Sequence, residues 1–303
     1  IPTGYEAAFG QVWHNYAVAR LTLPAPQLVE MDCNVGVKGE GFEYIFGRGK
    51  GLVSIRYNGV QLLDDTVRPN FWRAPTNNDE GCAEPFTFAF WKTAGLYARC
   101  DNLTAETKGD FVIARANYTL PDGQTLPIDF AIDGAGRCDI TMTWQGTRTE
   151  LPEFGLLFPL RRELTEVSYL GLGPRETTAD RTAGGKMGAW NYNVRQDFAQ
   201  NTPVYPQECG SRTGVYSATV TGSIPGICFA GNGMTFSALP YTPHELENAR
   251  HLYELPRDDN KTVVRCAAFQ RGVGGDNSWG AKPHADACFA VEKGTSFRFT
   301  IQK

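Results

Sequence analysis

One segment near the end of the chain, Gln270–His284, combines residue types that are typical of a ligand-binding loop. Four glycines surround a single tryptophan, Trp279. Because glycine permits positive φ angles and close approach of another segment, the pattern predicts a shaped loop and not a helix. Asp276, Asn277 and Ser278 precede the tryptophan, and these residue types hydrogen-bond their own backbone in turns. A tryptophan in such a loop either fills the core or offers a flat surface to a ligand.

A second segment, 68–81, combines arginine, proline, asparagine and a carboxylate. Asn77, Asn78 and Asp79 could hydrogen-bond hydroxyl groups or supply oxygen ligands to a hard cation. Arg73 could bind a carboxylate through two hydrogen bonds. Alternatively, Arg73 and Asp79 join two turns inside the domain, and we favour this structural role because a corner rich in proline and asparagine needs such contacts. The same two interpretations, with the same preference, apply to four more charged residues: Glu176, Asp180, Arg181 and Glu208.

Sequence patterns of several catalytic and cofactor-binding sites are absent, among them the nucleophile elbow, the Walker loop, the dinucleotide-binding glycines and the His-Glu-x-x-His zinc motif. The eight cysteines occur singly, without zinc-finger spacing to a histidine, which favours free thiols. Conventional retaining glycosidases need two carboxylates about 5–5.5 Å apart, and no pair in the sequence is identified as one. We therefore assign no catalytic residue, no metal site and no cofactor to this chain.

The elements that must position these residues are predominantly strands. Apolar runs alternate with turn sequences at short intervals, and Asn58-Gly59 predicts a tight hairpin turn. Gly231-Asn-Gly233 predicts a turn between two further strands, and helical periodicity is confined to 88–96 and 244–250. The pattern is typical of a sandwich or barrel, so we predict an all-β fold. The predicted strands are 42–46, 52–57, 60–63, 111–120, 126–132, 138–144, 215–221, 226–230, 234–239, 287–291 and 296–301.

The composition is that of an ordinary globular protein, with 303 residues, 42% of them hydrophobic and 20% charged. A net charge of −4 gives no basic surface for nucleic acid, and no apolar run reaches the roughly 18 residues that span a membrane. Pro24 and Pro26 favour a boundary. We expect residues 1–26 to be the end of a preceding domain with a connector, and 27–303 to be one domain. Because the sequence begins at Ile1, we expect a part of a longer or processed protein, and we assign no compartment.

The order and spacing of these motifs resemble the C-terminal domain of the large β-galactosidases of glycoside hydrolase family 2, a region that is a separate small subunit in some bacteria. Residues 1–26 resemble the last strand of the immunoglobulin-like domain that precedes it. Asn77 stands where the family usually has aspartate, and 177–179 lacks the family's Asn-Tyr pair. The matching segments are 71–79, 91–97, 169–176 with Asp180 and Arg181, 206–210, 237–241 and 275–280.

The resemblance implies a galactose-mutarotase-like supersandwich of antiparallel strands. It also implies a retaining β-galactosidase whose two catalytic glutamates lie in a barrel domain outside this chain, so the chain alone is expected to be inactive. Trp279 would be its substrate-binding residue, with Asp276, Asn277 and Ser278 shaping the loop, and the segment 80–90 would lie near the mouth of the active site. The implied partners are a galactoside, the barrel and other domains of the same protein, and further copies of the full-length enzyme in a homo-oligomer. The resemblance also implies Mg²⁺ and Na⁺ as ions bound by the full-length enzyme.

Three alternatives remain open from the sequence. The chain could be a separate small subunit of a split β-galactosidase, or an independent carbohydrate-binding module on a β-sandwich. It could also be a mutarotase-like epimerase, which needs a histidine and a glutamate as acid and base. The four histidines, His14, His244, His251 and His284, have no recognisable partner motif, and we expect them to be structural or exposed.

Overall fold

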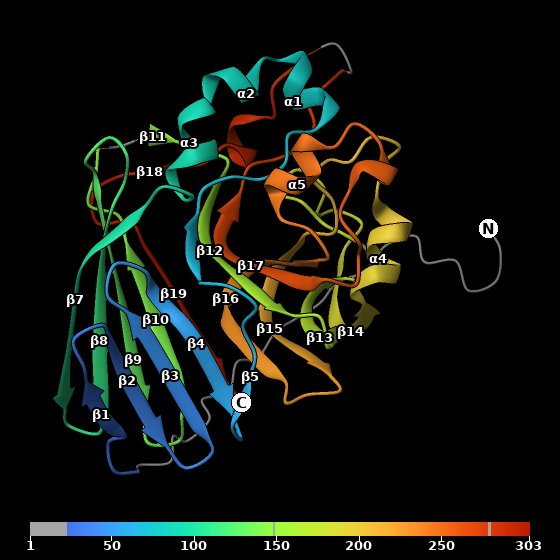
Figure 1. The fold of residues 1–303 in the computed structure, drawn as a ribbon. Coiled ribbons are helices and arrows are strands. Elements are labelled where there is room, and N and C mark those ends of the chain that lie inside the picture. Colours follow the sequence, from blue (N-terminus) through green and yellow to red (C-terminus); the bar gives the residue numbers. More distant parts are fainter. Residues whose placement is uncertain (1–22, 148, 278–279) are drawn as a thin grey trace.

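Antiparallel strands make up most of the chain, as the computed structural model in Figure 1 shows. The structure describes residues 23–147, 149–277 and 280–303. Within these ranges the helices are few and short, so the expected all-β fold is confirmed. No helix of this part of the chain is long and apolar enough to cross a membrane. The described part of the predicted connector, 23–26, precedes the first strand, and residues 1–22 lie outside the described residues.

A five-stranded antiparallel sheet opens the domain, with its strands in chain order. Buried and half-buried positions alternate along its third strand, as expected of a strand with one face on a core. Asn58 and Gly59 have φ angles of 52° and 78°, which confirms the predicted hairpin turn between the last two strands. The five strands are β1 (Gln27–Glu30), β2 (Asn34–Gly39), β3 (Phe42–Gly47), β4 (Gly51–Tyr57) and β5 (Val60–Gln61).

A twelve-stranded antiparallel sheet contains most of the remaining strands and divides at one long strand, β16 (Ile227–Leu239). The first part of β16 pairs with β19, and the second part pairs with β17. One path runs through β14 (Lys186–Asn193), β13 (Leu164–Gly173), β15 (Arg212–Gly222), β16, β19 (Ser296–Gln302), β10 (Cys138–Thr143), β9 (Thr125–Asp133), β8 (Phe111–Thr119) and β7 (Arg99–Lys108). The branch adds β17 (Lys261–Gln270), β12 (Glu153–Arg161) and β6 (Arg68–Asn70), and β11 (Thr149–Glu150) pairs separately with β18 (Ala290–Val291).

The predicted turn at Gly231-Asn-Gly233 is wrong, because β16 continues through it. Opposite it, β15 pairs Ser217 with Ala230 and Val215 with Met234, so the extra residues of β16 are accommodated as an irregularity in the ladder. The glycines permit this local distortion, and the strand changes its neighbour at the same point. The Gly-Asn-Gly sequence therefore marks a bulge within one strand, where we expected a turn between two strands.

Short helices gather around one end of the strands, where Figure 1 shows α1, α2, α3 and α5. The helical periodicity at 88–96 and 244–250 corresponds to α3 and α5. In α4 only Val194 and Phe198 are buried apolar residues, which left too little periodicity to predict it. The helices are α1 (Asn77–Gly81), α2 (Glu84–Thr87), α3 (Ala89–Ala94), α4 (Val194–Asn201), α5 (Pro243–Asn248), and the 3-10 turns η1 (Leu252–Glu254) and η2 (Ala285–Ala287).

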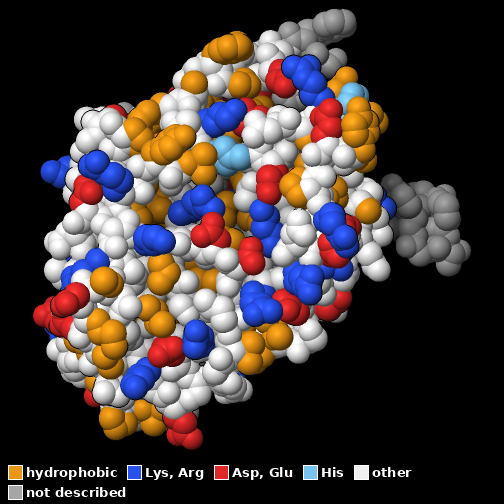
Figure 2. Space-filling model, in the orientation of Figure 1, with side chains coloured by type: hydrophobic (Ala, Val, Ile, Leu, Met, Phe, Trp, Pro, Cys, Tyr) orange, Lys and Arg blue, Asp and Glu red, His pale blue; other side chains and the backbone are white. Residues whose placement is uncertain are grey.

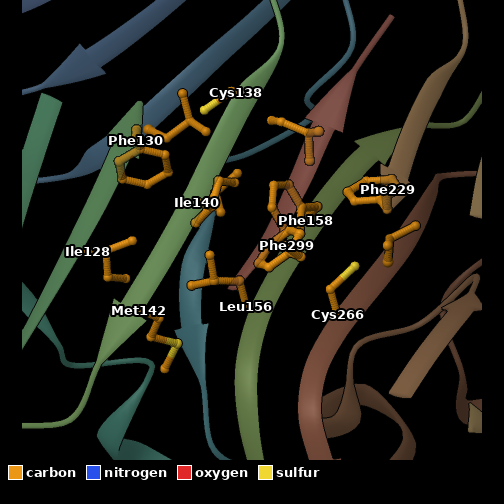
Figure 3. Close-up of a cluster of buried hydrophobic side chains, with 14 of the residues drawn as sticks. Ile128, Phe130, Cys138, Ile140, Met142, Leu156, Phe158, Phe229, Cys266 and Phe299 are labelled. Carbon is orange, nitrogen blue, oxygen red and sulfur yellow. The ribbon is translucent and has the colours of Figure 1, made fainter. Parts of the chain in front are cut away.

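A continuous apolar core joins the two sheets. The rings of Phe46 on β3 and Phe130 on β9 have centroids 5.0 Å apart, so the first sheet packs on the second. Figure 3 shows Phe158 of β12 beside Phe229 and Phe299, with ring centroids 5.1 and 6.0 Å away. Both branches of the large sheet therefore share one core, which gives a rigid base for the loops at the helical end.

Candidate functional site

The glycine-rich loop continues from the end of β17, and its first residues are fixed to the backbone of neighbouring segments. Arg271 donates its backbone N–H to Pro152 O over 2.8 Å, and Gly272 donates to Ala287 O over 2.9 Å. Over its described residues, 271–277 and 280–284, the segment has no regular secondary structure, as expected of a shaped loop.

The carboxylate of Asp180 holds the next two residues of the loop. Its Oδ2 accepts the backbone N–H groups of Val273 and Gly274 at 2.8 and 2.7 Å. Its Oδ1 accepts the Thr178 hydroxyl at 2.6 Å, so both oxygens have donors. Hydrogen bonds to a carboxylate are stronger than those between neutral groups, and Asp180 therefore fixes the direction in which the loop leaves the sheet.

Glu176 and Arg181 stabilise the turn that carries Asp180. Arg181 donates Nη2 to Glu176 Oε1 over 2.6 Å and Nε to Thr178 Oγ1 over 3.2 Å. The second oxygen of Glu176 accepts the N–H of Gly210 at 2.7 Å. The three charged residues that the sequence singled out here thus lie in one hydrogen-bonded turn beside the loop.

The segment around α1 holds the loop from the opposite side. Arg73 donates Nη2 to Gly272 O over 2.8 Å. Thr76 Oγ1 and Asn78 Nδ2 both donate to Val273 O, at 3.3 and 3.4 Å. The loop base therefore lies between Asp180 on one side and α1 with its preceding residues on the other.

Arg73 and Asp79 form a buried ion pair with two contacts, Nη1–Oδ2 at 2.5 Å and Nη2–Oδ1 at 3.0 Å. Asp79 also accepts the backbone N–H of Thr76 at 2.6 Å, which completes the capping box of α1, whose N-cap is Thr76. Burial acts to raise the pKa of Asp79, but the charge and hydrogen bonds of Arg73 outweigh it and keep that pKa below its ordinary value. Asp79 is consequently a carboxylate that positions Arg73 and α1.

The side chain of Arg271 connects the loop to α2. Its Nη2 and Nε donate to Glu84 Oε1 over 2.6 and 2.9 Å, and its guanidinium lies 5.1 Å from the centroid of the Phe88 ring. Burial raises the pKa of Glu84, although the contact with Arg271 opposes the shift. Residues 80–90 are thus joined to the loop base by a buried charge pair and a cation–π contact.

Gln270, just before the loop, contacts a further cluster of buried charged side chains. The sequence did not reveal these residues as a cluster. Arg265 donates to Glu153 over 2.7 Å and forms a second ion pair with Glu208. Gln270 donates Nε2 to both carboxylates, at 3.0 and 3.1 Å. Burial raises the pKa of Glu153, opposed by Arg265. The sequence feature that could have indicated this cluster is Arg265, the single charged residue in the largely apolar run 262–269.

The outer part of the loop is exposed at Asp276 and Asn277. Ser278 and Trp279 lie outside the described residues. Beyond them His284 Nε2 is 2.7 Å from Asp276 Oδ1, so an ion pair joins the two arms. Together with Asp180, these arms border a hollow of about 370 Å³. The loop is therefore held at its base by buried contacts. Further out, its arms are joined by this ion pair and by the backbone N–H of Ala281, which donates to Asn277 Oδ1 over 3.4 Å.

Three buried carboxylates around the loop base position neighbouring groups. The carboxylates of Asp79, Glu84 and Glu153 are buried in contacts with arginines or amides. No group of three or more histidine, cysteine or acidic side chains in the described ranges could hold a metal ion. The histidines differ in their surroundings: His244 contacts Lys92 O at 2.7 Å, His284 pairs with Asp276, and His14 lies outside the described residues.

The chain has clear relatives. Residues 38–301 match the sequence family described as Beta galactosidase small chain. A β-galactosidase of Lactobacillus delbrueckii subsp. bulgaricus is 38% identical over 284 residues, which cover 91% of this chain and 28% of that protein. A β-galactosidase of Halalkalibacterium halodurans is 33% identical over 316 residues, with coverage of 99% and 31%. This chain thus spans less than a third of the length of these two relatives.

Another relative has nearly the length of this chain. The β-galactosidase small subunit of Latilactobacillus sakei is 30% identical over 308 residues, which cover 89% of this chain and 95% of that subunit. Among solved structures, galactose 1-epimerase of Lactobacillus acidophilus NCFM aligns with 91% of this chain and 96% of its own, at a TM-score of 0.44 and 9% identity.

Removing the charge of Asp79 is expected to destabilise the domain strongly. Asp79→Asn leaves the buried Arg73 without a counter-charge, and breaking such a pair costs about 3–5 kcal/mol of unfolding free energy. The matched control is Asp129→Asn, which breaks the exposed Arg115–Asp129 pair and should cost about 0–1 kcal/mol. Urea unfolding of both variants measures the difference, and equal losses would contradict the assigned role of Arg73 and Asp79.

The same pair predicts a dependence on acid. Because the pKa of Asp79 is lowered on folding, its contribution is present above the ordinary value of 3.8 and is lost as the pH falls through the folded-state value. The stability difference between the original protein and Asp79→Asn should therefore shrink below about pH 4. A difference that stays constant down to about pH 2 would contradict the assignment of Asp79 as the ionised partner of Arg73.

Gly280 is expected to tolerate no side chain. Its φ is +97°, and a Cβ there would overlap the carbonyl oxygen of Gly81. Gly274 has room, because the atom nearest to where its Cβ would stand is 3.6 Å away, on Asn78. Gly280→Ala should therefore displace the loop and weaken any function that depends on it, whereas Gly274→Ala should not. Hydrogen exchange of residues 271–284 measures the displacement, and equal exchange in the two variants would refute it.

The contact between the loop arms predicts a raised histidine pKa. The hydrogen bond and charge of Asp276 raise the pKa of His284 above 6.5, so the ion pair is complete below that pH and is lost as the pH rises through the raised value. In Asp276→Asn the NMR titration of His284 should return toward 6.5, while His244, whose pKa is lowered by burial, should not change. An unchanged titration of His284 would mean that Asp276 and His284 are not paired in solution.

Proposed function

Because the chain belongs to the β-galactosidase small chain family, we propose that it completes the galactose site of a β-galactosidase while another part performs catalysis. In this proposal the enzyme hydrolyses terminal β-galactosides with retention and has the domain arrangement of glycoside hydrolase family 2. The two catalytic glutamates lie in a barrel outside this chain, so the chain alone is inactive.

The observation that supports the proposal best is the construction of the loop base. Three segments far apart in sequence meet Gly272 and Val273: Arg73 with Thr76 and Asn78, the turn of Asp180, and the η2 residue Ala287. Such a base fixes the orientation of the short exposed loop that follows it. A rigid base is what a recognition residue needs, because binding then costs little conformational entropy.

Trp279 is the residue to which we assign galactose binding. An indole offers a flat hydrophobic surface that can stack against the apolar face of a galactosyl ring. By analogy with the stacking of bases on aromatic side chains, about 1–3 kcal/mol of binding energy is involved. Asp276, Asn277 and Ser278 shape the loop around it. The catalytic carboxylates come from the remainder of the enzyme.

The proposal applies to both arrangements that occur among the relatives. In one-chain β-galactosidases the region is about 30% of the protein, and in the Latilactobacillus sakei relative it is a separate small subunit. In either case the galactose site lies between this chain and a catalytic part. The family resemblance also implies Mg²⁺ and Na⁺ in the full-length enzyme, and we assign these ions to the part outside this chain.

Replacing Trp279 in the assembled enzyme tests the proposal. Trp279→Ala should raise the KM or inhibition constant for galactosides by about one to two powers of ten, because the stacking energy is lost. Trp279→Phe keeps a flat ring and should lose less. The thermal unfolding midpoint should stay unchanged in both variants. Unchanged kinetics in Trp279→Ala would refute the assignment, and tight galactose binding by the isolated chain would favour an independent carbohydrate-binding module.

A further inference from the structure

Exposed hydrophobic side chains gather on two neighbouring segments that the proposed galactose site does not use. Val204 and Tyr205 follow α4 and are 85% and 50% exposed. Leu252 and Tyr253 begin the η1 turn and are 47% and 81% exposed. Together with His251 we call these residues the tyrosine surface. Figure 2 shows hydrophobic side chains at the upper right of the molecule, where Figure 1 has the segments after α4 and α5.

Ring contacts hold the tyrosine surface together. The His251 ring is stacked between Tyr205, at 6.2 Å and an interplanar angle of 27°, and Tyr253, at 5.2 Å and 15°. The backbone N–H of His251 also donates to Glu254 Oε2 over 3.1 Å. The two segments thus form one preorganised apolar surface, which reduces the entropy lost when a partner covers it.

A hollow of about 450 Å³ adjoins this surface. Its lining includes Tyr205, Gln207 and Arg250, together with Asn77 and Glu80 of α1. Protein–protein binding hot spots are rich in tyrosine and arginine, which lie at pockets and are surrounded by polar groups. The residues around this hollow have the same composition. The exposed aliphatic side chain of Val204 favours a protein partner over a sugar, which would stack on flat rings alone.

Hydrogen bonds connect the hollow to the loop base. Gln207 donates Nε2 to Tyr205 O and accepts the N–H of Asn77, both at 3.2 Å. The next residue of α1, Asn78, donates to Val273 O in the loop base. The tyrosine surface and the glycine-rich loop therefore lie on either side of α1, at the same end of the molecule.

We propose that the tyrosine surface is a docking surface for the catalytic part of the β-galactosidase. The inference rests on the proposed function. More than two-thirds of each one-chain relative lies outside the region that this chain matches, so a large partner has to be accommodated. A partner docked on the tyrosine surface would extend across α1 to the loop and place the galactose site between the two parts.

Photo-crosslinking in the assembled enzyme tests the docking surface. p-Benzoylphenylalanine replacing Tyr253 should form crosslinks, identified by mass spectrometry, to peptides from outside residues 1–303. The matched control is the same replacement of Tyr97, which is 67% exposed near the end of α3 and should form none. Crosslinks to peptides within 1–303 would show that a second copy covers the surface, and their absence would show that it is free. Either result would overturn the proposal.

Substitution gives an independent readout. Tyr205→Ser combined with Tyr253→Ser removes two exposed rings and should weaken docking about tenfold or more, as hot-spot residues do. The urea concentration at which the assembled enzyme loses activity should fall in this variant and stay unchanged in Tyr97→Ser. Equal sensitivity in the two would overturn the docking surface. Failure of the proposed function would be seen separately, as unchanged kinetics in Trp279→Ala, because crosslinking reports contact and not galactose binding.

Discussion

The buried guanidinium of Arg73 is the group on which the arrangement of this domain's helical end depends. It pairs with Asp79, a residue of α1 that takes part in its capping box, and also donates to Gly272 O at the start of the loop. Removing two charges from water is costly, so a buried ion pair is weak evidence for stability alone. Here its geometry joins a helix to a loop, and we interpret its role as fixing one arrangement of the two.

The same principle recurs around the loop base. Arg271 joins the loop to Glu84 of α2, and Arg265 joins β17 to two carboxylates that Gln270 also contacts. Arg73, Arg265 and Arg271 thus each contact a distant part of the chain. The glycine-rich segment has a defined conformation although it forms no helix or strand. Neighbouring segments supply the hydrogen bonds that a partner strand would otherwise provide.

The sequence predicted strands best where one face is buried and the other is half-exposed, as in β3 and β8. It failed to indicate β12, which is buried at almost every position, since an uninterrupted apolar run is not distinguishable by periodicity from a buried helix. At the site, the residue types of Arg73, Asp79 and Asp180 were visible. The contacts of Arg73 and Asp180 with the loop span more than 90 positions, and only the sheet topology brings these segments together.

We propose that the loop forms one wall of a galactose site whose catalytic groups lie elsewhere. A structure of the assembled enzyme with bound galactose tests it most directly. We expect the sugar to contact the loop between Gly275 and His284, and both carboxylates that flank its anomeric carbon to come from outside residues 1–303. A galactose bound away from this loop, or flanked by two carboxylates of this chain, would contradict it.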